Sequence, residues 1–254
     1  MDASEHFQVT GCAGLPFGPT VRMRNLDAGR KSTLRSWNPR MRLVVTQKDG
    51  EAGIKGAQVT LPHSVILDQS NIRTICTRAQ FAAQRCPRQA IYGHAKAWSP
   101  VLNRPVTGPV YLGSSPNPLP DLIVDLDGEV RVTLQGRIDT ARGGWIRNTF
   151  TAVPDAPVSR FELTMFGGKN RGLLVNSTDL CRSNERGVAR FDGHNGKQSG
   201  QRLRIGLRYR GCKQVRKRIA RRQAAREVAK RKAARRVIER MSSSTHSPRS
   251  ATRN

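Results

Sequence analysis

Acidic residues are scarce in this chain. Its 254 residues include 18 Asp and Glu against 45 Lys and Arg, which gives a formal net charge of +27. Such an excess repels itself unless an anionic polymer or surface screens it, so the charge predicts an anionic partner. Nucleic acid, an anionic cell-wall polymer and an anionic lipid surface all meet this requirement, because electrostatics alone does not distinguish them.

Aromatic side chains and long apolar runs are also few. Aromatic residues make up 5% of the chain and hydrophobic residues 37%, so a core must rely on Val, Leu and Ile. No segment reaches the roughly 18 apolar residues of a transmembrane helix. The first residues, Met1 to Glu5, have neither the basic nor the apolar region of an export signal. Taken literally, this predicts the cytoplasm; a fragment or a misassigned start is the alternative.

Catalytic and metal-binding motifs are absent. The sequence has no H-E-x-x-H, G-x-S-x-G or C-x-x-C pattern, and His63, His94 and His194 lie far apart. Asp125 and Asp127 are close enough to share a calcium site, but an outward charge and a turn former explain them better. We therefore predict no catalytic residue, no cofactor and no metal ligand.

A surface that binds or cleaves glycans is the enzymatic alternative. Tyr92, Trp98 and Tyr111 could line a sugar-binding surface, although core packing or strand pairing accounts for them more simply. Asp121 and Asp125 share a strand face but are separated by roughly 13 Å of strand. Glycosidase carboxylates stand about 5 to 9.5 Å apart, so these two form a poor pair.

Apolar and polar side chains alternate in many segments, which is the pattern of a half-buried strand. The alternation is found at 21–24, 41–45, 130–138, 160–165 and 202–210. In the last of these, arginines occupy one face and apolar residues the other. Asp127-Gly128 follows the apolar segment 122–126, and this dipeptide predicts a hairpin with a tight type I′ turn.

These strands predict an all-β fold of the antiparallel β-sandwich or jelly-roll type. We expect one short internal helix, at Ile75 to Gln84, because alanines favour helix there. The expected organisation is an N-terminal extension (1–8), a sandwich module (9–212), a basic helix (213–241) and a disordered tail (242–254). The module could contain two sub-sheets, 9–62 and 88–212, joined by a helix and disulfide segment (63–87).

The C-terminal region is strongly cationic. Residues 213–240 contain thirteen Lys or Arg, two acids and neither Gly nor Pro, which predicts a helix. Its apolar stripe is thin, so the helix should be mostly solvated. We expect it to bind polyanions through charge, with the following residues in contact: Lys213, Arg216, Lys217, Arg218, Arg221, Arg222, Arg226, Lys230, Arg231, Lys232, Arg235 and Arg236.

Five cysteines are present: Cys12, Cys76, Cys86, Cys181 and Cys212. The ten-residue step from Cys76 to Cys86 suits a short disulfide loop, which would contribute roughly 3 kcal/mol in the chain-entropy description. Buried free thiols are the alternative, and they are expected if the protein is intracellular. The odd total leaves one cysteine unpaired or paired outside the chain.

Several dozen residues, in matching order along the sequence, resemble a known family. They stand in GCAGLPFGPTVRM (11–23), VTLPHSVILDQSNIRTICTRAQFAAQRCP (59–87), GPVYLGSS (108–115), LPDLIVDLDG (119–128), LQGRID (134–139) and IRNTFTAVPDAPVSRFELTMFGGKNRGLLVNSTDLC (146–181). From about Val9 to Lys197 the chain resembles secreted actinobacterial proteins of unknown function. In that family the module is repeated in tandem in longer proteins that bear an export signal.

The resemblance implies an oxidising, extracytoplasmic location, which makes disulfides the expected state of the cysteines. It also implies a second pair, Cys181 with Cys212, because Gly211-Cys212 stands where the next module would open. Cys12 would then have lost its partner in an upstream module. The chain departs from the family pattern in lacking an export signal, and the resemblance brings no catalytic residue.

We therefore expect a non-catalytic secreted or cell-envelope module with a structural or adhesive role. Its basic tail would contact an anionic cell-wall polymer or anionic surface, and further copies of the module are additional expected partners. The alternative is an intracellular nucleic-acid-binding protein that uses the same helix. A glycan-acting envelope enzyme is the weaker alternative. Disulfides favour the first hypothesis, and free thiols with co-purifying nucleic acid favour the second.

Overall fold

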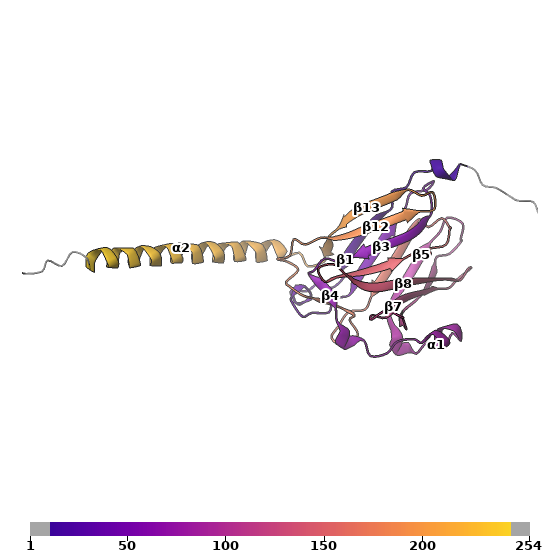
Figure 1. Ribbon diagram of the computed structural model, residues 1–254, viewed down its shortest axis with the longest axis horizontal. Helices are drawn as coiled ribbons and strands as arrows, with labels where there is room; N and C mark the ends of the chain where they lie inside the picture. The colour runs from indigo at the N-terminus through magenta and orange to yellow at the C-terminus, as the bar shows by residue number, and fades with distance from the viewer. Residues whose placement is uncertain (1–10, 245–254) are drawn as a thin grey trace, which may run out of the picture. The chain divides into compact units, whose positions relative to one another are not determined.

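The computed structural model describes residues 11–244, which divide after Arg210 into a β unit and a helical unit. In the β unit twelve strands form one curved mixed sheet (Figure 1). In sheet order they are β13 (Gln198–Leu203), β12 (Gly187–Gly193), β3 (Ile54–Thr60), β9 (Trp145–Phe150), β8 (Val132–Ala141), β7 (Asp121–Leu126), β6 (Val106–Gly113), β5 (Ile91–Trp98), β10 (Arg160–Met165), β2 (Met41–Thr46), β1 (Thr20–Asn25) and β14 (Ile205–Leu207). A separate two-stranded sheet pairs β11 (Leu174–Asn176) with β4 (Val65–Leu67).

The alternation of apolar and polar residues in the sequence corresponds to an alternation of buried and exposed residues in the structure. In β1 every second residue is buried and the intervening ones are exposed. The predicted strands near 21–24, 41–45, 130–138 and 160–165 are present as β1, β2, β8 and β10. Neighbouring strands are antiparallel except for β1 and β14, which run parallel. Successive side chains of a strand point to opposite faces of the sheet, so every second side chain faces the inside of the curve. The apolar residues of these strands therefore form its inner wall.

The large sheet nearly closes into a barrel, and one side chain bridges the gap. Along one edge of β1, residues 23–25 pair with β14. Farther along that strand, the Val21 N–H donates to Gln201 Oε1 at 3.0 Å, and Gln201 Nε2 donates to the Val21 carbonyl at 2.8 Å. Gln201 belongs to β13, the strand at the other end of the sheet. Its side-chain amide therefore makes the two hydrogen bonds that a neighbouring strand would make.

The all-β class is confirmed, but the sandwich or jelly-roll arrangement is not. Apart from β11, the strands from 9–62 and 88–212 belong to one sheet rather than two, since β3 lies between β12 and β9 and β2 lies between β10 and β1. The expected strand 202–210 is interrupted at Arg204. Residues before the break pair with β12 and residues after it pair with β1, so the change of partner divides the strand.

The hairpin at Asp127-Gly128 is present, but its turn is not the expected type. Strands β7 and β8 pair antiparallel with Leu126 opposite Val132, so five residues form the loop. A type I′ turn requires residues with positive φ, and Gly128 is not among the described residues with positive φ. Instead, Asp127 exchanges two backbone hydrogen bonds with Thr107 of β6. This bridge extends the pairing of β6 with the chain beyond β7, and the five-residue loop replaces the two-residue turn.

The internal helix is shorter than expected. Helix α1 spans Arg78–Ala82 rather than Ile75 to Gln84. Thr77 caps it by accepting from the Gln80 backbone, and the Gln80 side chain accepts from the Thr77 backbone in return. Four short 3₁₀ turns in the described residues lie at Cys12–Gly14, Arg30–Thr33, Gln69–Asn71 and Arg88–Ala90.

The helical unit contains α2, which spans Cys212–Ser244 and thus slightly exceeds the predicted 213–241. The first three residues of the predicted disordered tail belong to this helix. The rest of that tail, 245–254, and the predicted extension 1–8 lie outside the described residues.

A partly buried ion pair joins two loops, 26–40 and 177–186. Arg30 and Asp179 form a bidentate ion pair, with N–O distances of 2.9 and 2.5 Å. The Cys181 backbone amide also donates to Asp179, at 3.0 Å. Burial alone would raise the pKa of the Asp179 carboxyl, but the hydrogen bonds from Arg30 and Cys181 outweigh it and hold that pKa below its usual range. The pair therefore fixes the segment that leads to Cys181.

The Asp179 pair predicts a pH-dependent stability. Because its folded-state pKa is lowered, the pair contributes fully above the unfolded pKa of about 3.9 and is lost as pH falls through the folded-state value. The difference in unfolding free energy between wild type and Asp179→Asn should hold from about pH 7 to about pH 5 and shrink below about pH 4. Urea titrations across this range measure it, with the exposed Asp49→Asn as control. A difference that does not vary with pH would contradict this assignment.

The bridge at Val21 predicts a specific loss of stability. Gln201→Met keeps the length of the side chain but leaves the Val21 N–H and carbonyl unpaired. Val21 is 1% exposed, so water cannot replace these bonds well, and we expect a loss of about 2 kcal/mol. Gln198→Met is the matched control, because the exposed Gln198 side chain donates to the Asp192 side chain and not to the backbone of a neighbouring strand. Equal effects of the two substitutions on denaturant unfolding would show that the bridge does not close the sheet.

Candidate functional site

The inside of the curved sheet contains a cavity of about 370 Å³. Its wall is formed by inward-facing residues of the strands, and almost all of them are aliphatic or Phe. Examples on different strands are Met23, Leu43, Val59, Leu134 and Leu163. No charged side chain of the described residues lines it. The sheet is therefore hollow along part of its length rather than filled by its own side chains.

Four loops surround the cavity at one end of the sheet. The loops 47–53, 99–105, 127–131 and 151–159 each connect strands whose ends lie there, and each contributes residues to the cavity wall. Two of these wall residues are exposed apolar side chains, Val101 at 70% and Val130 at 45%. This end, which we call the mouth, is thus a place where apolar surface is continuous from solvent to the interior.

Asn148 is the exceptional polar residue of the wall. It lies in β9 opposite Ile138 of β8 and Val59 of β3, which are both apolar. Both polar atoms of its side chain, Oδ1 and Nδ2, are buried and have no hydrogen-bond partner. Gly136 makes room for it, because a Cβ there would lie 2.6 Å from Asn148 Oδ1. Buried polar groups are nearly always paired, so an unpaired amide in an apolar cavity calls for a partner.

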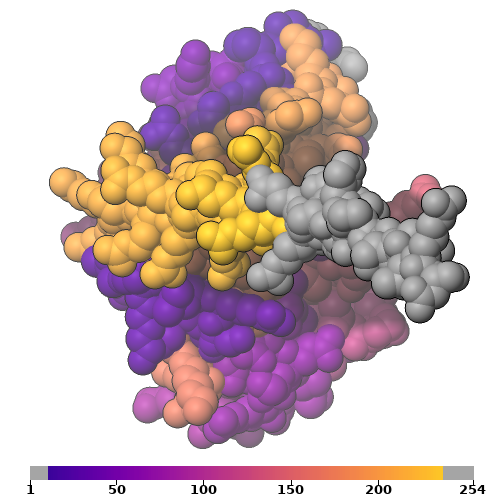
Figure 2. All heavy atoms as spheres, turned by 90° about the vertical axis from the view of Figure 1, so that its left-hand side faces the viewer, coloured from indigo at the N-terminus to yellow at the C-terminus, as the bar shows by residue number. Residues whose placement is uncertain are grey.

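The predicted polyanion-binding residues all lie on α2 and are exposed as far as Arg236. The side chains of this helix extend to several sides of its axis (Figure 2). Glu227 is the single acidic residue between Lys213 and Arg236, and it pairs with Lys230 at 3.5 Å. The helix therefore presents positive charge around its circumference rather than on one face.

The outer face of the large sheet carries positive charge that is partly neutralised. Asp125 forms a two-bond ion pair with Arg131, and Asp139 forms one with Arg147. The hydrogen bond from Arg147 is the main reason why the pKa of Asp139 lies below its usual range. Because these carboxylates already have arginine partners, the outer face differs from α2, where basic residues greatly outnumber acids.

The structure does not bring the candidate catalytic or metal-binding groups together. Asp125 is bonded to Arg131 and Thr133, and Asp121 accepts from Gln135 on the neighbouring strand. Within residues 11–244 no three His, Cys, Asp or Glu side chains form a group that could hold a metal. His194 contacts Asp155 and the Val153 carbonyl.

The aromatic residues considered for sugar binding serve other contacts. Tyr92 is 3% exposed, and its hydroxyl exchanges hydrogen bonds with the backbone at Arg73 and Thr74. Tyr111 stacks edge-on against Phe81 of α1, and the Trp98 ring lies beneath Lys96. Tyr92 thus packs in the core and Tyr111 packs against α1, whereas the Trp98 ring is partly exposed and contacts basic side chains.

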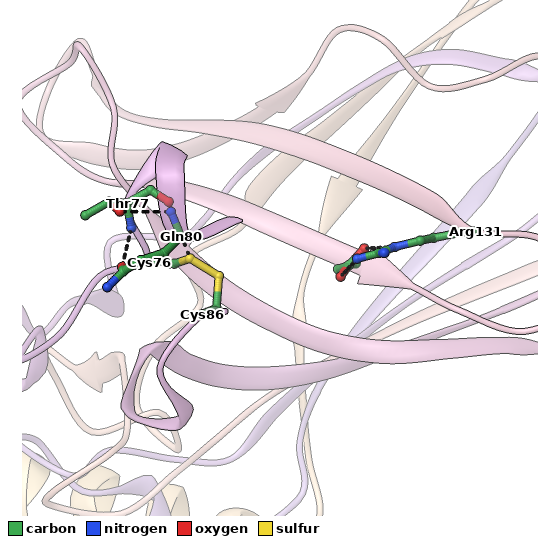
Figure 3. Close-up of a disulfide and its surroundings, with 6 residues drawn as sticks. Cys76, Thr77, Gln80, Cys86 and Arg131 are labelled. Carbon is green, nitrogen blue, oxygen red and sulfur yellow. Dashed lines mark hydrogen bonds and ion pairs between the residues drawn. A yellow bond between two sulfur atoms is a disulfide. The ribbon is translucent and has the colours of Figure 1, made fainter. Parts of the chain in front are cut away.

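Two disulfides are present. Cys76 is bonded to Cys86, and Figure 3 shows this bond beside the cap of α1. Cys76 is also fixed to β6, because its N–H donates to the Leu112 carbonyl and its carbonyl accepts from Ser114. Cys181 and Cys212 are disulfide-bonded as well, whereas Cys12 is free and exposed. The four cysteines predicted to form disulfides are thus the four that do.

Comparison of the chain with protein-family models, with curated proteins and with solved structures finds no match. None of the helices in residues 11–244 has the length and apolar character needed to cross a membrane. The candidate sites consequently stand on their own geometry: an apolar interior with one unpaired amide, and a cationic helix.

The Cys76–Cys86 bond predicts a measurable stabilisation. Replacing both residues by alanine should lower the free energy of unfolding by roughly 3 kcal/mol, since the bond restricts the unfolded chain over a ten-residue separation. Cys12→Ala is the control and should change nothing, because Cys12 is free and exposed. Guanidinium unfolding without reductant measures the difference. If the double variant were as stable as the control, the disulfide would have no structural role.

Proposed function

We propose that the protein is a non-catalytic extracytoplasmic module of a cell envelope, held to an anionic polymer or surface by α2. The observation that carries this proposal is the charge of α2, whose exposed Lys and Arg side chains surround the helix almost without acids. Such a charge distribution contacts closely spaced phosphates or carboxylates on any side. It supports binding by charge density rather than recognition of one sequence.

The disulfides support the location. Two disulfides in a chain of this length are typical of oxidising compartments and are rare in the cytosol. They agree with what the resemblance to secreted actinobacterial proteins implies. An intracellular nucleic-acid-binding protein would carry its cysteines as thiols, so the disulfides favour the envelope over that alternative.

The composition of α2 also argues against recognition of particular bases. No aromatic residue lies between Lys213 and Arg236, so the helix offers no platform on which bases could stack. Specific reading of duplex DNA requires a few side chains that reach base edges from one face, whereas these basic residues surround the axis. DNA should therefore bind to α2 as a polyanion among others.

The test compares two full-length variants that lose the same charge. One replaces six α2 residues by Gln, which favours helix: Arg221, Arg222, Lys230, Arg231, Lys232 and Arg235. The other replaces six exposed residues of the β unit by Gln: Arg22, Arg24, Arg137, Arg190, Arg202 and Arg204. Binding to poly(glycerol phosphate), duplex DNA and a neutral glycan is measured across a salt series.

We expect the wild type and the β-unit variant to bind both polyanions and the α2 variant to bind them weakly. If about six phosphates of duplex DNA are engaged, the logarithm of the affinity should fall with the logarithm of the salt concentration with a slope of about −5. The neutral glycan should not bind. Loss of binding in the β-unit variant alone would place the contact on the sheet arginines, and strong preference for one DNA sequence would favour the intracellular alternative.

A further inference from the structure

We propose that the interior of the large sheet binds the aliphatic chain of an uncharged lipid, and that a hydroxyl or carbonyl group of this lipid hydrogen-bonds to Asn148. This site is separate from α2, and it assigns to the β unit a ligand of a different chemical class.

The size of the cavity fits a small ligand. Its volume of about 370 Å³ lies within the range of roughly 300 to 1,000 Å³ that small-molecule sites occupy. A protein core is otherwise close-packed, and an empty apolar void lowers stability as its volume grows. A hydrocarbon that fills this space would restore the missing contacts. The void is therefore better understood as a site than as a fault of packing.

The shape of the wall favours an extended chain. Lining residues run along β8 from Val132, next to the mouth, to Ile138, a span of roughly 20 Å at the usual rise per residue. Met41 and Leu174 line the cavity far from the mouth. Aliphatic side chains dominate the wall, and they match a hydrocarbon chain in polarity. We infer a single hydrocarbon chain rather than a flat ring system.

The mouth offers a route of entry. Val101 and Val130 are exposed there although both are apolar, and both line the cavity. The loops that carry them are fixed to each other, because Glu129 accepts from the Arg104 N–H at 2.9 Å and from Asn103 Nδ2 at 3.3 Å. Exposed apolar side chains on a fixed rim give a hydrocarbon a first contact before it enters.

The chemistry inside selects against charge. Among the described residues the wall holds no Lys, Arg or His that could neutralise a carboxylate or phosphate, and burial of an unpaired charge is very unfavourable. Gln47, another polar residue of the wall, already donates to the Ala52 carbonyl. Asn148 Oδ1 and Nδ2 have no partner but are buried within the wall, so a turn of this side chain toward the cavity would offer a ligand both a donor and an acceptor. A hydrocarbon ligand that carries one neutral hydrogen-bonding group therefore matches this interior.

The experiment uses decanol as the probe and the full chain as the protein. Calorimetric titration should show one decanol bound per chain. Decanoate, at a pH where it is ionised, should bind at least about tenfold more weakly, because its carboxylate would lose hydration without gaining a cation. Absence of decanol binding to the wild type would overturn the proposal. Equal affinity for decanoate would overturn the role of Asn148, since the polar group would then remain at the mouth.

Two matched pairs of variants locate the site. Val132→Trp fills the cavity and should weaken decanol binding about tenfold or more, whereas Thr133→Trp on the outer face of the same strand should not. Asn148→Leu removes the amide and should weaken decanol binding about tenfold, whereas Thr149→Val on the outer face should not. Near-ultraviolet circular dichroism and thermal unfolding confirm that each variant is folded.

The outcomes are distinguishable. Loss of binding in Thr133→Trp as much as in Val132→Trp would place decanol on the surface and overturn the proposal. If Val132→Trp failed to fold, Ala57→Leu on β3 would provide the same test, because Ala57 also lines the cavity. None of these substitutions changes α2, so a failure here leaves the polyanion experiment to stand on its own result.

Discussion

The enclosed apolar interior depends on how the two edge strands of the large sheet are paired. An open sheet exposes two edges of unpaired N–H and carbonyl groups, and closure is the arrangement that removes them. Here β14 covers part of β1, and the Gln201 amide covers the rest by bonding to both backbone groups of Val21. With that bridge in place, inward-facing residues on opposite sides of the sheet share one interior. Without it, the apolar faces of the strands would be open to water.

Much of the β unit follows from local pattern. Alternation with a period of two revealed β1, β2, β8 and β10, because burial of one face leaves a direct trace in the sequence. The break at Arg204 left no such trace. The residues on both sides keep the same alternation, and the division arises only because β13 and β14 pair with different strands. Whether the strands form a sandwich or a single curved sheet likewise depends on which strands pair across long sequence separations, and the alternation within each strand does not show this.

The cavity could not be predicted from the same pattern. Inward-facing Val, Leu and Ile look alike in sequence whether they meet other side chains or surround a space. One signal was present: Ile146, Asn148 and Phe150 share a parity in β9, so Asn148 interrupts an apolar face. The charge of α2, by contrast, was evident from composition, because thirteen basic residues in a segment without Gly or Pro predict both a helix and its solvation.

We propose two binding sites in one chain, a charged helix for polyanions and an apolar interior for a lipid chain, and the second site requires a closed sheet. Amide hydrogen exchange of Val21, followed by nuclear magnetic resonance in the wild type, tests closure most directly. If Gln201 bridges β13 and β1, the Val21 amide exchanges as slowly as the paired amides in the middle of β1 and β2. If the sheet is open there, Val21 exchanges at the fast rate of a free strand edge, and the enclosed interior is contradicted.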